Sequence, residues 1–324
     1  MTITKNKQSE ALIRRMVQNA FPKKQMASYM ELTEGMCNTA YMINFADGNK
    51  SVLKIATKDN RGRMSNEVNL MEAEVTAMGL VSAADVVKVA QIQYYDKSNK
   101  ICDGHYFFME ALEGESLSSM AEQFSEEERA IINYEIGQAE KKISSIQDKT
   151  FGLLGDTERA YETLYDFVYM LISNVLSDAE KKEVTFGVSP EEILILLKQY
   201  QEVFEEVKIP VLVHWDMWEG NVFVKDGHIS GIIDWERAMW GEPFMDDRFR
   251  RHTRNKDFLR GFGQEEFAAE EMSRILWYDI LLYLTMMTEG AYREYEDDGL
   301  YQWTKPLFEA SWEELKVKEE VEKC

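Results

Sequence analysis

The sequence predicts an α+β protein with two lobes, a small N-terminal antiparallel β lobe with one helix and a larger, mainly helical C-terminal lobe. Two observations carry this prediction. Short β-rich runs joined by turn signals are concentrated between about residues 28 and 112. Beyond Gly114, helical spacing and helix caps dominate, interrupted by one β-rich segment at 211–235. We therefore expect domains at residues 1–112 and 113–324.

The first lobe is expected to contain two hairpins and a helix. Strands at 41–45 and 51–55 are joined by a loop with an Asp-Gly pair, which is a strong hairpin signal. Residues 63–78 carry apolar side chains at helical spacing. A second hairpin follows, with strands at 92–95 and 106–109. These elements predict an antiparallel sheet with a helix inserted between its hairpins.

The second lobe is expected to be helical around a small β insert. Ser125 and Glu128 form a capping-box pattern, and Ser189 followed by proline is a typical helix start. The expected helices lie at 125–146, at 158–176, after Ser189, at 265–289 and at 305–319. The expected strands of the insert lie at 222–224 and 229–233.

The composition limits the possible partners. The 324 residues include 58 acidic and 37 basic side chains, which gives a formal net charge of −21. Such a charge repels nucleic acid and anionic membranes and attracts cationic ligands, so we expect no nucleic-acid or membrane partner. Acidity that simply keeps a cytoplasmic protein in solution explains the charge equally well. We expect a monomer, since nothing in the sequence demands a dimer.

Cysteine content and apolar runs favour a cytoplasmic protein in a reducing compartment. The three cysteines are far apart and form no Cys-x-x-Cys pair: Cys37, Cys102 and Cys324. Neither a disulfide scaffold nor a structural zinc site is therefore indicated. Residues 1–10 are polar and lack a signal-peptide core, and the longest apolar runs, 167–176 and 275–287, are too short to span a bilayer.

The residues with the clearest chemistry lie between His214 and Asp234. Residues 214–221 read His-Trp-Asp-Met-Trp-Glu-Gly-Asn, and the β segment that follows ends at Asp234. Carboxylate and amide oxygens are the ligands that Mg²⁺ prefers beside nucleotide phosphates, and an additional Asp can orient an attacking hydroxyl. Taken singly, Asp216 could be a turn residue and Asn221 a cap. Their combined spacing favours phosphoryl transfer.

This segment resembles the catalytic loop and metal-binding strand of the aminoglycoside phosphotransferase-like kinases. That family shares the protein-kinase fold and includes choline, homoserine, fructosamine and methylthioribose kinases. Its pattern is His-x-Asp, Asn five residues later, and an apolar strand that ends in Asp-Trp. A Gly-x-Pro-x-x-Asp pattern follows, matched here by Gly241, Pro243 and Asp246. The resemblance covers about residues 28–250. Trp215, where the family commonly has Gly, and the bulky Trp218 are expected to reshape the acceptor wall.

The resemblance implies roles for these residues. Asp216 would be the catalytic base or hydroxyl-orienting group, and Asn221 and Asp234 would bind Mg²⁺. His214 would brace the loop, and Asp246 would steady the same region. Residues 1–112 would form the nucleotide-binding lobe, and residues 113–324 the catalytic and substrate-binding lobe.

In the first lobe, Lys54 on the 51–55 strand resembles the lysine that contacts the α- and β-phosphates. A lone lysine in an apolar strand is otherwise a surface residue whose ammonium reaches water. The family's lysine pairs with a glutamate on the next helix. Glu67 is the expected partner, and Glu72 and Glu74 are the alternatives because the helix register is open.

Two further segments resemble nucleotide-contacting parts of the family. Residues 34–39 occupy the position of the phosphate-covering loop, where Asn38 and Thr39 would approach the phosphates, although an ordinary turn explains the loop equally well. Residues 107–114 resemble the connection between lobes, where backbone groups near Glu110 and Leu112 would bind the purine edge. Core packing is the alternative for its apolar side chains.

The implied activity is transfer of the γ-phosphate of ATP, with GTP as the alternative donor, to a hydroxyl with the help of Mg²⁺. The chain has no Asp-Phe-Gly and no Ala-Pro-Glu, so we expect a small-molecule acceptor. An aminoglycoside or other amine-bearing sugar is the leading expectation. Choline, another amino sugar, a macrolide, a protein acceptor and a non-catalytic nucleotide-binding protein are the alternatives. The acidic residues considered for a cationic acceptor are Asp156, Glu158, Glu236, Glu242, Glu289, Glu294, Asp297 and Asp298.

Overall fold

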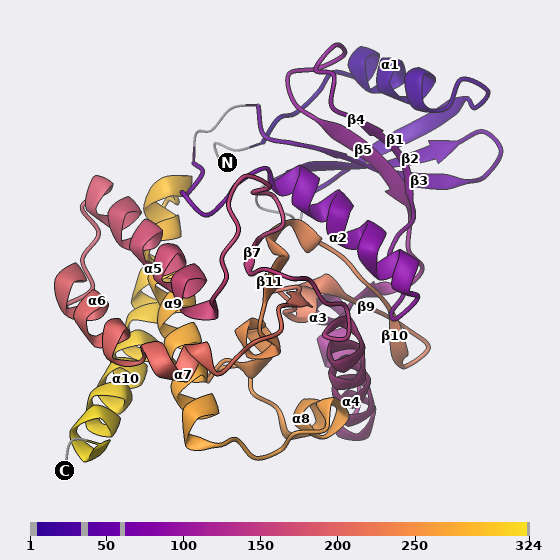
Figure 1. Cartoon of the computed structure of the whole chain (residues 1–324). Helices are drawn as coiled ribbons and strands as arrows, with labels where there is room; N and C mark the ends of the chain where they lie inside the picture. Colours follow the sequence, from indigo (N-terminus) through magenta and orange to yellow (C-terminus); the bar gives the residue numbers. More distant parts are fainter. Residues whose placement is uncertain (1–4, 34–37, 59–61, 323–324) are drawn as a thin grey trace.

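The structure, a computed structural model, describes residues 5–33, 38–58 and 62–322, and the side chains of the last five of these residues are not described. The chain has an antiparallel sheet at its N-terminal end and a mainly helical remainder, as the sequence predicts (Figure 1). No helix within the described ranges combines the length and apolar character needed to cross a bilayer.

Within the described residues, five strands form the N-terminal sheet in the order β1-β2-β3-β5-β4, with every neighbouring pair antiparallel. These strands are β1 (Met26–Leu32), β2 (Thr39–Phe45), β3 (Lys50–Ile55), β4 (Ile92–Asp96) and β5 (Tyr106–Glu110). Side chains of β2 alternate between buried and half-buried positions, as a strand with one covered face requires. Both predicted hairpins are confirmed.

Two helices cover opposite faces of this sheet (Figure 1). Helix α1 (Glu10–Ala20), to which the sequence analysis assigned no element, is capped by Ser9 and buries Ile13, Met16 and Val17 against one face. Helix α2 (Leu70–Ala84) lies on the other face, between the sheet and the helical part of the chain. The strands of the first lobe thus form a sheet with a packed core on each side.

The helix expected at 63–78 is present as α2, but it begins at Leu70, so the expected start is wrong. Residues 62–69, here called the crossing segment, run irregularly because their side chains bind the helical part of the chain. Ser65 donates two hydrogen bonds of 2.6 Å to the Asp178 carboxylate, and Asn66 donates one of 2.9 Å to the Leu171 carbonyl. Asn69, in the left-handed conformation, ends the segment.

The C-terminal part is built around long helices, of which α5, α9 and α10 pack side by side (Figure 1). The capping boxes predicted at Ser125 and Ser189 are both present. The helix expected at 158–176 starts later, where Thr163 supplies its cap. The helices are α3 (Leu117–Met120), α4 (Glu126–Ile143), α5 (Leu164–Lys181), α6 (Pro190–Gln199), α7 (Gln201–Glu205), α8 (Lys256–Phe262), α9 (Ala269–Arg293) and α10 (Gly299–Glu322).

Short strands at the junction position the candidate site. They are β6 (Glu115–Ser116), β7 (Gly152–Leu153), β8 (Val211–Val213), β9 (Val222–Lys225), β10 (His228–Ile232) and β11 (Met239–Gly241). Strand β9 lies between β10 and β6, and β11 lies between β7 and β8. The loop from β8 to β9 and the turn after β10 therefore meet at one place, and both carry the polar residues singled out by the sequence.

Candidate active site

His214 fixes the shape of the loop between β8 and β9. Its buried ring donates from Nε2 to the Ile233 carbonyl at 2.9 Å and accepts at Nδ1 from the Asp216 amide at 3.3 Å. Burial lowers the pKa of His214 to about 4, which keeps the ring neutral and consistent with this pattern. The ring also lies edge-on to Trp235, at 4.5 Å between centroids. His214 thus joins the loop to the residue that precedes Asp234.

Asp216 and Asn221 lie at the two ends of this loop and contact each other. Asn221 Nδ2 donates to the Asp216 carbonyl at 2.8 Å and lies 3.4 Å from its carboxylate. The Asn221 carbonyl accepts from the Ile233 amide at 3.0 Å, which ties the loop to the strand leading to Asp234. This arrangement leaves the amide oxygen of Asn221 as the atom available to a cation.

The Asp216 carboxyl is suited to holding a proton. Its side chain is half-buried, and desolvation raises its pKa well above the ordinary value of 3.8. The positive charge of Arg237 works in the opposite direction. Further carboxylates raise the pKa again: Asp234, Asp247 and Glu289. A carboxylate in this setting is a better proton acceptor than one in water.

Lys54 on β3 points into a group of three carboxylates. Its ammonium lies 2.7 Å from Glu74, 2.5 Å from Asp234 and 3.5 Å from Glu236. Burial opposes the charge on Lys54, but the three carboxylates raise its pKa well above the ordinary value. Burial also opposes the charge on Glu74 and raises its pKa to about 8, although the positive charge of Lys54 partly offsets this effect. For Asp234, the attraction of Lys54 overcomes burial and lowers the pKa.

The expected pairing of Lys54 with Glu67 is wrong, because Glu74, one of the alternatives, is the partner on α2. Glu67 lies in the crossing segment instead. Its carboxylate binds Arg293 at 2.5 Å and Arg237 at 3.3 Å, and accepts from the Met64 amide at 2.9 Å. The helix starts seven residues later than predicted, which moves a different glutamate to the position facing the sheet.

Asn38 and Thr39 lie at the start of β2, close to the carboxylate group. Asn38 Nδ2 donates to Glu236 at 2.5 Å. The Thr39 hydroxyl is buried and finds no hydrogen-bond partner among the described residues, so it is a polar group left over by the protein's own contacts. The rest of the expected phosphate-covering loop, 34–37, lies outside the described residues.

Glu110 and Leu112 lie where the chain leaves the sheet. Glu110 is the last residue of β5; its amide donates to the Gln91 carbonyl at 2.9 Å, and its carboxylate lies 3.2 Å from Lys88. Leu112 is half-buried in the connection to β6 and packs close to Gly231. Their role toward a purine stays a prediction.

The donor set beside Lys54 fits a hard divalent cation. Glu74, Asp234 and Glu236 each offer an oxygen atom, and these atoms lie within 4.8 Å of one another. Oxygen ligands of this kind suit Mg²⁺ that also binds nucleotide phosphates. The sequence analysis considered Glu236 only for a cationic acceptor and did not single out Arg237. Both residues follow Asp234 in the 3₁₀ turn Trp235–Arg237. Their position directly after a predicted metal ligand is the sequence signal that could have identified them.

Several acids considered for a cationic acceptor bind partners inside the molecule. Glu242 is buried with Arg274 at 3.0 Å and accepts from Tyr278 at 2.6 Å. Glu289 lies 2.9 Å from Arg237. The remaining pairs are local: Asp156 with Arg159, Asp297 with the Gly299 amide, and Asp298 with Gln302.

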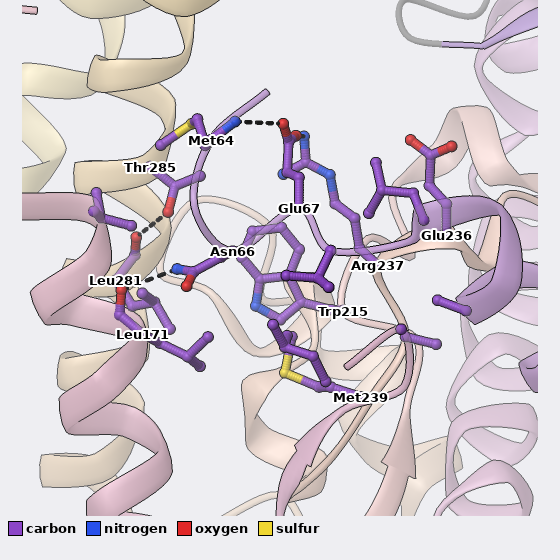
Figure 2. Close-up of a pocket in the computed structure, with 17 residues that line it drawn as sticks. Met64, Asn66, Glu67, Leu171, Trp215, Glu236, Arg237, Met239, Leu281 and Thr285 are labelled. Carbon is purple, nitrogen blue, oxygen red and sulfur yellow. Dashed lines mark hydrogen bonds and ion pairs between the residues drawn. The ribbon is translucent and has the colours of Figure 1, made fainter. Parts of the chain in front are cut away.

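A pocket lies against the loop, between the crossing segment and helices α5 and α9. Figure 2 shows Trp215 at its centre, with Glu67 and Arg237 on one side of the ring and Met239 on the other. Trp215 adopts a left-handed backbone conformation, with φ of 73°. The Arg237 guanidinium lies over its ring, 5.3 Å from the centroid.

Comparisons with known proteins agree on one family. The model of the phosphotransferase enzyme family matches residues 28–246, more than half of the chain. No curated protein shows significant sequence similarity to it. Among solved structures, aminoglycoside phosphotransferase APH(4)-Ia superposes with a TM-score of 0.66 at 18% identity, covering 94% of this chain and 98% of that one. A streptomycin-ATP-APH(2")-IIa ternary complex superposes with a TM-score of 0.60 at 16% identity, covering 94% and 97%. Both likenesses concern the fold.

Proposed function

The chain belongs to the phosphotransferase enzyme family, and on this premise we propose that it transfers the γ-phosphoryl group of ATP to a hydroxyl of a small molecule, with Mg²⁺ as cofactor. GTP is the alternative donor. The observation that carries the proposal is the meeting of Lys54, three carboxylates and the Asp216–Asn221 pair at one junction. Structural neighbours solved with ADP and hygromycin B, or with ATP and streptomycin, support a nucleotide donor and a small acceptor.

In the proposed reaction, the protein positions the two substrates and stabilises negative charge. The Asp216 carboxylate would accept the proton of the attacking hydroxyl, and its raised pKa suits that task. Lys54 would exchange part of its contact with Asp234 for the phosphates of the nucleotide. Asn221, Asp234 and Glu236 would hold Mg²⁺, which neutralises phosphate charge when bound. His214 keeps the Asp216 amide and the residue before Asp234 in fixed relation.

The acceptor can be proposed at two levels of detail, as a small-molecule alcohol in general or as an aminoglycoside in particular. Structural neighbours in complex with hygromycin B or streptomycin support an aminoglycoside or other amine-bearing sugar. Against this, acids such as Glu242 and Glu289 are already paired with arginines. Both observations support a small-molecule alcohol as the acceptor.

The test is phosphate transfer from labelled ATP and GTP, with Mg²⁺, into aminoglycosides, macrolides, choline, amino sugars and uncharged alcohols. Asp216→Asn is the matched variant, because it keeps size and hydrogen-bonding capacity. We expect it to lower kcat by a factor of about 10²–10⁴ while nucleotide affinity changes little, as for loss of a positioned base. Unchanged kcat in Asp216→Asn would remove the role assigned to this residue. Nucleotide binding without transfer would favour a non-catalytic binding protein.

A further inference from the structure

We propose that the acceptor is an alcohol with a slender apolar body and without ammonium groups, held in the pocket against Trp215. The inference rests on the proposed phosphotransfer and specifies its substrate class. Three observations carry it: the position of the pocket, the chemistry of its walls, and the pairing of every carboxylate that lines it.

The pocket lies beside the loop and the turn that carry the reacting groups, and sequence neighbours of these groups line it. Trp215 directly precedes Asp216, and Glu236 and Arg237 follow Asp234 in the next turn; all three of these neighbours line the pocket. The Arg237 guanidinium lies over the Trp215 ring, 5.3 Å from its centroid. A molecule bound against the Trp215 ring therefore lies next to the loop that carries Asp216.

The walls are mainly apolar and come from six separate parts of the chain. The apolar lining residues are Met64, Val68, Leu70, Ala73, Leu153, Leu171, Val175, Trp215, Ala238, Met239 and Leu281. About 580 Å³ of empty space lies between the walls, including the part open to solvent, but a water-sized sphere can be centred in only about 50 Å³. The pocket is thus narrow, and a flat or slender apolar group fits it better than a polyhydroxylated ring system.

The carboxylates that line the pocket already have partners within the protein. Glu67 binds Arg237, Arg293 and a backbone amide, and Glu236 binds Lys54 and Asn38. The polar side chains Asn66 and Thr285 donate to the carbonyls of Leu171 and Leu281. An ammonium group in this pocket would lose its hydration, would lie near Arg237, and would meet no carboxylate without a partner among the lining residues. That combination disfavours a polycationic acceptor.

The test compares ligands on the nucleotide-loaded protein and includes one pair of equal length, 1-heptanol and 6-amino-1-hexanol. Binding of 1-heptanol, 6-amino-1-hexanol, 2-phenylethanol, hygromycin B and streptomycin is measured by calorimetry in the presence of AMP-PNP and Mg²⁺. Phosphate transfer from ATP to the same compounds is then followed separately. We expect each uncharged alcohol to bind at least tenfold more tightly than 6-amino-1-hexanol and both aminoglycosides, since pocket chemistry discriminates by about this factor.

Two matched variants link this preference to the pocket. Leu171→Ala removes a wall residue, and Leu176→Ala makes the same change at a buried position of helix α5 that does not line the pocket. We expect Leu171→Ala to weaken binding of the uncharged alcohols about tenfold, with AMP-PNP affinity unchanged, and Leu176→Ala to leave both within threefold.

The outcomes separate the inference from the proposed function. Tighter binding of an aminoglycoside than of any uncharged alcohol, or equal effects of the two leucine variants, would overturn the inference while phosphate transfer could still stand. Failure to bind any uncharged alcohol when AMP-PNP binds would also overturn it. Absence of AMP-PNP binding would reject the proposed function itself.

Discussion

Because His214 is buried and neutral, the free energy of unfolding is expected to depend on pH by a predictable amount. The unfolded chain binds a proton on this histidine below its ordinary pKa of 6.5, whereas the folded protein does so only below about 4. Between these values the unfolded state holds more protons, so stability falls as the pH falls through this window. The full effect is about 3 kcal/mol, of which about 2 kcal/mol is lost between pH 7 and pH 5.

The assay is urea unfolding of the wild-type protein and His214→Asn at pH 7 and pH 5. The variant is less stable at both pH values because it loses the ring contact with Trp235 and the hydrogen bond to the Ile233 carbonyl. The informative quantity is the difference in unfolding free energy between the two proteins. It should shrink by about 2 kcal/mol at pH 5, because other titrating groups act on both proteins. A difference that stays constant with pH would refute the assignment of a neutral buried ring.

Two further predictions concern the crossing segment and the Lys54 pair. A Cβ on Gly155 would lie 1.9 Å from a backbone oxygen of the crossing segment, whereas one on Gly79, inside helix α2, would meet no atom within 4 Å. Gly155→Ala should therefore lower the urea unfolding free energy by about 1–3 kcal/mol, and Gly79→Ala should raise it by about 0.5–1 kcal/mol; equal effects would contradict the packing. Glu74→Gln should weaken nucleotide binding because Lys54 loses its partner, while Glu67→Gln should leave nucleotide binding within twofold and cost about 2 kcal/mol of stability, as measured by titration and urea unfolding. Weaker nucleotide binding in Glu67→Gln than in Glu74→Gln would instead support a pairing of Lys54 with Glu67.

Much of the candidate site could be predicted because its residues are close in sequence. His214, Asp216 and Asn221 lie in one loop, and a hairpin of fixed length brings Asp234 back to it. Lys54 comes from a distant strand and could be selected because its local sequence resembles a known family. Local sequence patterns of this kind do not depend on contacts with the rest of the fold, so the residues that they indicate are found at the site in the structure.

The partner of Lys54 could not be predicted, because the helix register depends on contacts distant in the sequence. Ser65 binds Asp178, and Asn66 accepts from Asn174, both more than 100 residues away. These bonds hold residues that have helical spacing in a non-helical path. Helix α1 is different: Ser9 and the spacing of Ile13, Met16 and Val17 were visible, so its omission was avoidable.

For the acceptor proposed above, the net charge of the chain is a poor guide. A charge of −21 attracts cations over long distances, but the field of exposed acids is screened within about 10 Å at ordinary salt. In this proposal, selectivity is set in the pocket, where Glu67 and Glu236 have cationic partners and Arg237 covers Trp215. The pairing of Arg237 and Arg293 with Glu67 depends on contacts between the crossing segment, the turn after β10 and helix α9. An acidic protein can therefore carry an acceptor pocket that favours an uncharged, apolar ligand.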